Sequence, residues 1–76
     1  MDLRDLRYFE TIAELEHIGR ATERLHRTQP ALSSCVRRLE QACGAPLLEK
    51  AGRGIRLTPA GRVLLKWAQQ VRIDVE

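Results

Sequence analysis

Two amphipathic segments separated by a short polar turn occupy the middle of this 76-residue chain. Apolar residues recur with helical spacing over residues 18–26 and again over residues 29–42. Thr28 is placed to cap the second helix, and Pro30 is tolerated in its first turn, where a missing N–H costs no hydrogen bond. Gly44 is expected to end that helix in a left-handed conformation. Two helices joined this tightly predict a helix-turn-helix, whose second helix fits the DNA major groove.

The second of these helices has two unlike sides. Leu32, Val36, Leu39 and Cys43 form a narrow apolar stripe, so Cys43 is expected to be a small core residue, while Cys35 lies on the flank of the stripe. The other half of the helix carries polar and basic residues, which are Pro30, Ser33, Ser34, Arg37, Arg38 and Gln41. This polar half is the surface that we expect to be free for a partner.

The segments before and after the helix-turn-helix complete a winged helix. Asp2 is expected to cap a first helix that ends near Leu15. Its apolar arc, with Ile12 at the edge, holds Leu3, Leu6, Phe9 and Ala13. Two short runs around a glycine-rich tip at residues 51–54 predict a β-hairpin. We therefore expect a mainly α fold: three helices and a hairpin wing over residues 1–58, then a long linker helix over 59–76.

The last helix has the clearest start signal in the chain, a Thr58 cap followed by Pro59 at the first helical position. Apolar residues then recur at heptad-like spacing. Gly61 and Leu64 are expected to pack on the domain's own core, and the end of the helix is expected to reach a second subunit. The residues expected to contribute to dimerisation are Leu64, Leu65, Ala68, Val71 and Val75.

Positive charge is concentrated in one part of the chain. Residues 1–16 carry a net charge of −3, residues 17–66 carry +7 and residues 67–76 carry −1, and eleven of the thirteen basic residues are arginine. This segregation favours a polyanionic partner, and arginine suits phosphate and guanine contacts. The sequence contains neither a signal peptide nor an apolar run near the ~20 residues of a membrane span, so we expect a cytoplasmic protein.

Nothing in the sequence points to catalysis, a cofactor or a metal. Cys35 and Cys43 are separated by about 12 Å of helix, which is too far for a disulfide, and two cysteines do not make a zinc site. His17 and His26 have no nucleophile or acidic partners at catalytic spacing, and the motifs of phosphate loops and dinucleotide folds are absent. We expect a binding protein rather than an enzyme.

Base edges are read near the start of a recognition helix, where Gln29, Ala31, Ser33 and Ser34 lie. Gln29 suits a bidentate contact to adenine. Arg37 follows one turn later, within reach of a base or the backbone. Arg53, between two glycines at the hairpin tip, is placed to enter a narrow A·T-rich minor groove. A protein-binding winged helix and an RNA-binding domain are alternatives, but the scarcity of aromatic residues disfavours RNA.

Several segments resemble the N-terminal DNA-binding domain of LysR-type transcriptional regulators. Residues 3–9 look like its opening helix, and residues 21–33 (Ala-Thr-Glu-Arg-Leu-His-Arg-Thr-Gln-Pro-Ala-Leu-Ser) are similar to its helix-turn-helix. The segments that follow, residues 38–40, 44–48 and 57–61, also match. The resemblance implies a homodimer through antiparallel linker helices, tetramers in full-length relatives, and binding to an interrupted inverted repeat in promoter DNA.

The resemblance also assigns roles to single residues. It implies major-groove contacts by Gln29, Pro30 and Ser33, a minor-groove contact by Arg53, and supporting contacts by Thr28 and Arg37. The family commonly has a basic residue where this chain has Ser34, so Arg37 or Arg38 is expected to supply part of that contact. The C-terminal effector-binding domain usual in the family is absent, which suggests an excised domain or a truncated regulator with no small-molecule ligand.

Overall fold

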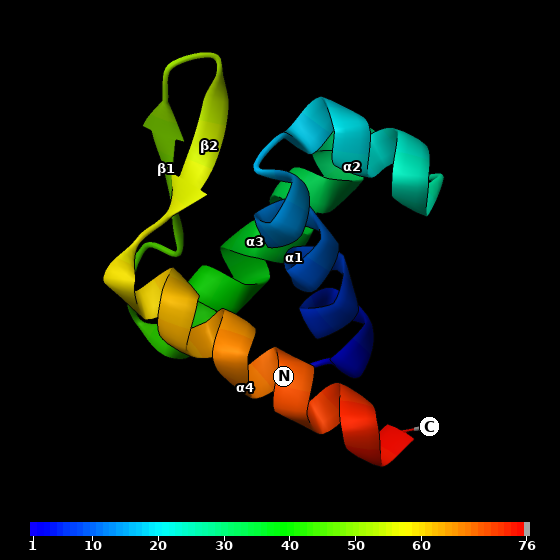
Figure 1. Cartoon of the computed structure of the whole chain (residues 1–76), viewed down its shortest axis with the longest axis vertical. Helices are drawn as coiled ribbons and strands as arrows, with labels where there is room; N and C mark the ends of the chain where they lie inside the picture. The colour runs from blue at the N-terminus through cyan, green and yellow to red at the C-terminus, as the bar shows by residue number, and fades with distance from the viewer. Residues whose placement is uncertain (76) are drawn as a thin grey trace.

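A computed structural model describes the backbone of residues 1–75 and the side chains of residues 1–71. Within that range the fold is mainly helical, as predicted, with one two-stranded antiparallel hairpin (Figure 1). The elements in chain order are α1 (Leu3–Leu15), α2 (Ile18–Leu25), α3 (Gln29–Cys43), β1 (Leu48–Ala51), β2 (Gly54–Leu57) and α4 (Pro59–Val75).

The helices begin at the caps that the sequence predicts. Side-chain oxygens of Asp2, Thr28 and Thr58 each accept a hydrogen bond from a first-turn N–H, at 2.8, 3.3 and 3.0 Å. Helix α2, which lacks a Ser, Thr, Asp or Asn at this position, is capped by Nδ1 of His17 at 3.1 Å. Gly44 ends α3 with φ 71°. These caps satisfy N–H groups that have no partner inside a helix, and so they fix the helix boundaries.

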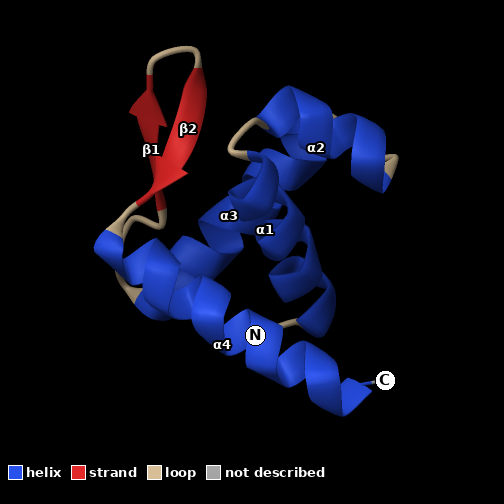
Figure 2. Cartoon of the chain, viewed as in Figure 1, coloured by secondary structure: helices blue, strands red, loops and turns tan. Residues whose placement is uncertain are grey.

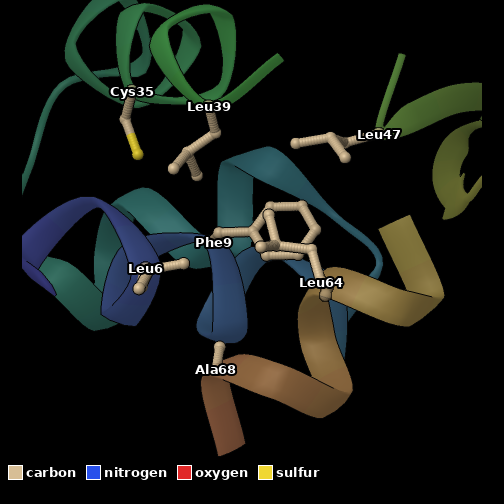
Figure 3. Packing of buried hydrophobic residues seen from close by; sticks show 8 residues of the cluster. Leu6, Phe9, Cys35, Leu39, Leu47, Leu64 and Ala68 are labelled. Atoms are coloured by element: carbon tan, nitrogen blue, oxygen red, sulfur yellow. The ribbon is translucent and has the colours of Figure 1, made fainter. Parts of the chain in front are cut away.

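Helix α1 is the centre of the packing, because α2, α3 and α4 all contact it. Phe9 is fully buried in the main core cluster, where Leu39 of α3 and Leu64 of α4 converge on it (Figure 3). A second cluster lies under the helix-turn-helix and consists of Ile12, Ala21, Leu32 and Val36. The two clusters together hold the recognition-helix candidate α3 against α1.

Three predictions about the core were wrong. Cys43 is exposed, whereas Cys35 is fully buried and points into the main cluster (Figure 3). Leu3 is 47% exposed, and Ile12, expected at the edge of the core, is fully buried. The cause is that α3 packs on α1 through the Cys35 side as well as through Leu39, so its buried arc is rotated away from Cys43 and wider than the apolar stripe.

The hairpin lies at one side of the molecule (Figure 2). Its strands pair in the register Leu48 with Leu57 through Ala51 with Gly54. Only Gly52 and Arg53 therefore form the turn, and Gly52 has φ 58°, a conformation that favours glycine. We call β1, β2 and this turn the wing.

The base of the wing is joined to α4 by backbone hydrogen bonding. The Thr58 N–H donates to the carbonyl of Leu47 at 3.1 Å, and the Thr58 hydroxyl donates to the carbonyl of Pro46 at 2.6 Å. Leu47 itself is fully buried in the main cluster. Across the part of the chain that the structure describes, no helix has the length and apolar character needed to cross a membrane.

Candidate nucleic-acid interface

An open groove lies between α3, the wing and the start of α2. Four residues predicted to bind DNA line it together: Gln29, Ser33 and Arg37 from α3, and Arg53 from the wing. The three α3 residues are spaced by four, so they lie one above another along one face of the helix. Gln29, Arg37 and Arg53 are exposed. The α3 residues thus bring an amide, a hydroxyl and a guanidinium group to one side of the groove. Arg53 brings a second guanidinium group to the side formed by the wing.

Three further predicted residues lie at the N-terminal end of α3 but do not line this groove. Thr28, Pro30 and Ala31 are all exposed. The Thr28 hydroxyl is the helix cap described above, so its oxygen already accepts a hydrogen bond. These residues surround the helix end, where base edges are approached in helix-turn-helix proteins.

Ser34 and Arg38 are engaged within the chain. The Ser34 hydroxyl accepts a hydrogen bond from Nη2 of Arg37 at 3.3 Å. Arg38 is turned away from the groove, and its Nε and Nη2 each donate to one carboxylate oxygen of Asp5 on α1 at 2.9 Å. The pair holds α3 on α1, and the Arg38 side chain remains 57% exposed, so a DNA contact by Arg38 stays a prediction. This pair could not be predicted from the helical pattern, because 33 residues separate its members.

The Asp5 pair changes the chemistry of its neighbours. The hydrogen bonds from Arg38 hold the pKa of the Asp5 carboxyl below its usual value. The Cys35 thiol donates to the Asp5 backbone carbonyl at 3.3 Å. Burial, reinforced by the nearby carboxylate, raises the pKa of Cys35 to about 12. The thiol is therefore protonated at neutral pH and is a poor nucleophile.

Sequence reasoning missed several groove residues. Lys50 of the wing adds a positive charge to the groove, and His17 and Gly19 bring the start of α2 to its edge. Glu40 also lines the groove, and its Oε2 accepts the N–H of Leu47 at 2.8 Å. Lys50 belongs to the basic central segment, so the charge pattern was a usable signal. The other three depend on contacts between elements, which periodicity does not report.

The turn of the helix-turn-helix is braced by α1. Nε of Arg27 donates to the hydroxyl of Tyr8 at 2.8 Å, and the guanidinium carbon lies 5.7 Å from the centre of the Tyr8 ring. This contact holds the chain just before Thr28 and α3. Among the described residues, no group of three or more His, Cys, Asp or Glu side chains is arranged to hold a metal ion.

Helix α4 divides its apolar residues between the core and the surface. Leu64, expected to pack on the domain's own core and also to contribute to dimerisation, is buried against α1 in the main cluster (Figure 3). Ala68, expected at a subunit interface, is buried in the same cluster. Leu65 is partly buried against the same cluster, and Val71 is half-buried. The side chain of Val75 lies outside the described residues. Among the described residues of α4, the large apolar side chains that are exposed are Val63, at 71%, and Trp67, at 47%. Neither of them belongs to the seam that the sequence predicted.

The chain matches known proteins in sequence. Residues 3–62 match the family model described as "Bacterial regulatory helix-turn-helix protein, lysR family". The chain is 50% identical over 62 residues to the HTH-type transcriptional regulator IlvR of Caulobacter vibrioides, covering 82% of this chain and 21% of IlvR. It is 47% identical over 76 residues to the Hca operon transcriptional activator HcaR of Escherichia coli, covering all of this chain and 26% of HcaR. The chain thus spans only about a quarter of such relatives.

Solved structures agree with these matches. The complex of the CbnR DNA-binding domain with DNA superposes with a TM-score of 0.92 at 37% identity, covering 99% of this chain and 86% of that one. The complex of the BenM DNA-binding domain with catB site 1 DNA gives a TM-score of 0.91 at 35% identity, covering 99% and 83%. The winged-helix fold predicted from the sequence is confirmed by these superpositions.

Proposed function

This chain belongs to the LysR family of bacterial regulatory helix-turn-helix proteins and is a DNA-binding domain, and we propose that it reads double-stranded DNA with α3 in the major groove and Arg53 in the minor groove. The relatives named above are transcriptional regulators, so the chain belongs with DNA-binding proteins rather than with enzymes. The observation that carries the proposal is the shared groove of Gln29, Ser33, Arg37 and Arg53.

The α3 face offers the chemistry that base reading requires. An amide such as that of Gln29 pairs with adenine through two hydrogen bonds, and an arginine such as Arg37 pairs with guanine or with a phosphate. Ser33 lies between them and suits a phosphate oxygen. Because Ser34 accepts from Arg37, it orients that guanidinium. Arg37 and Ser34 thus act as one unit in the proposal.

The wing offers a second, separate contact. Arg53 stands in the turn at the tip of the hairpin and carries the charge that a narrow minor groove attracts. Lys50 lines the protein groove between α3 and the wing, and its ammonium group suits the phosphates between the two DNA contacts. Support for this arrangement comes from the two similar domains whose structures are complexes with DNA.

We further propose that two copies pair through α4 on an interrupted inverted repeat. The exposed Val63 and Trp67 are four residues apart on one face of the helix, where a second α4 would cover them. A two-fold axis in the protein then matches dyad symmetry in the promoter DNA.

The experiment that tests the function compares ligands of matched sequence. Binding of the purified chain to a duplex, to its single strands and to an RNA hairpin is followed by fluorescence anisotropy at increasing salt. We expect duplex binding that weakens by about 10³-fold between about 50 and 200 mM salt if six phosphates are contacted. Equal affinity for the RNA hairpin, or salt-independent binding, would contradict the proposal.

A further inference from the structure

The wing is attached to the helices near its tip as well as at its base. The backbone N–H of Ile55, in β2, donates to the carbonyl oxygen of Glu16 at 3.2 Å. Glu16 ends α1 in a left-handed conformation with φ 53°, and its own N–H bonds back to the carbonyl of Ile12. The carbonyl of Glu16 is therefore held by the α1–α2 turn, and the wing is hydrogen-bonded to a fixed point.

Gly54 makes this attachment possible. A Cβ atom at Gly54 would lie 2.6 Å from the Glu16 carbonyl oxygen, a distance that real Cβ atoms do not reach. The obstructing atom belongs to backbone, so it has no rotamer by which to move aside. Gly52, the other wing glycine, differs in kind: its φ of 58° favours glycine, but nothing lies within 4 Å of its Cβ position. Space is therefore the requirement at Gly54, and conformation is the requirement at Gly52.

The wing is also held at its base. Besides the Thr58 bonds described above, the N–H of Leu47, the residue before β1, donates to the Glu40 carboxylate of α3 at 2.8 Å. The wing is thus connected to α3 at one end and to the start of the helix-turn-helix near the other. Attachments at both ends restrict the tilt of a two-stranded hairpin, which has little stability of its own.

We propose that Gly54 is a positioning residue that sets the distance between Arg53 and α3, and through it the preference for A·T-rich DNA beside the α3 contact. The inference rests on the proposed function, in which Arg53 enters the minor groove. A side chain at Gly54 displaces β2 from Glu16, and Arg53, the adjacent residue, moves with it. A misplaced contact group loses binding even when its own chemistry is intact.

The first readout needs no DNA. Amide hydrogen exchange is measured for Ile55 in the free wild-type chain, in Gly54→Ala and in the matched control Gly52→Asn, which keeps a residue tolerant of positive φ. We expect protection of Ile55 in the wild type and in Gly52→Asn and its loss in Gly54→Ala, with the helices unchanged by circular dichroism. An unprotected wild-type Ile55, or protection retained in Gly54→Ala, would overturn the inference. A Gly54→Ala chain that does not fold would also overturn it, because Gly54 would then serve the fold itself.

The second readout compares duplexes that share an α3 site and differ in A·T-rich or G·C-rich flanks. We expect Gly54→Ala to reduce the ratio of the affinity for A·T-rich flanks to the affinity for G·C-rich flanks by about tenfold. Arg53→Ala should reduce this ratio by the same amount, and the double variant should reduce it no further. A wild type without flank preference contradicts the wing contact in the proposed function, and the inference falls with it. A wild type with the preference, retained in Gly54→Ala, contradicts the inference alone.

Discussion

Asp5 on α1 and Arg38 on α3 form a two-pronged ion pair, with both N–O distances at 2.9 Å. The Asp5 side chain is almost fully buried, while that of Arg38 remains 57% exposed. Fork-to-fork geometry of this kind fixes orientation as well as distance. The pair therefore holds α3 at a set rotation on α1.

Replacing Arg38 with Ala should leave the buried Asp5 carboxylate without its ionic partner. We expect the midpoint of thermal unfolding at neutral pH to fall by about 4–8 °C. Because the pKa of Asp5 is depressed in the folded chain, its stabilising contribution is present above the unfolded value of 3.8 and is lost as pH falls through the folded value. Unfolding midpoints of wild type and Arg38→Ala should therefore converge in acid. A difference that persists at the lowest pH would contradict the assignment.

The two cysteines should react at very different rates. Cys43 is exposed, whereas Cys35 is buried with its pKa raised to about 12. Iodoacetamide at neutral pH should modify Cys43 and spare Cys35 until the chain unfolds, as followed by mass spectrometry of the peptides. Cys43→Ser gives the matched control, since that variant should stay unmodified in native buffer. Rapid modification of Cys35 in the folded chain would contradict its place in the core.

Substitutions on two faces of α4 should affect folding and self-association separately. Leu64→Ala removes a side chain from the main cluster and should cost about 2–5 kcal/mol of stability. Trp67→Ser changes an exposed side chain, so it should leave stability near the wild-type value and abolish self-association in sedimentation experiments. The opposite result, with Leu64→Ala stable but monomeric and Trp67→Ser dimeric, would restore the interface that the sequence predicted.

Local features of this fold could be predicted from the sequence, whereas contacts between helices could not. Helix boundaries were predictable because caps such as Thr28 and Thr58 act through local hydrogen bonds. The groove residues of α3 were predictable from helical spacing. The burial of Cys35 and the pairing of Arg38 depend on which helix lies beside α3, and a single periodic pattern carries no such information.

Gln29 should contribute to the discrimination between bases at one position of the DNA site. Replacement by Ala removes an amide able to make two hydrogen bonds to adenine, so discrimination at one base pair should fall by about 1–3 kcal/mol. Competition titrations with the four base pairs substituted in turn at each position of the site measure this directly. Uniform weakening at all positions would instead indicate a phosphate contact, and an unchanged preference would remove Gln29 from the reading surface.

Arg53 should contribute to DNA affinity through a contact in the minor groove. Arg53→Ala is expected to weaken binding most where the flanks are A·T-rich, because the narrow groove there concentrates negative potential. Arg53→Lys keeps the charge and serves as the matched control for general electrostatics. An equal loss on G·C-rich and A·T-rich flanks would place Arg53 on the phosphate backbone.

We propose that this domain reads a symmetric DNA site through α3 and the wing. The decisive measurement is the selection of bound sequences from a random duplex library with the purified chain. We expect an enriched A·T-rich motif with dyad symmetry and a spacer between its halves. A single enriched half-site would contradict pairing through α4, and no enrichment from a folded sample at low salt would contradict sequence-specific DNA reading itself.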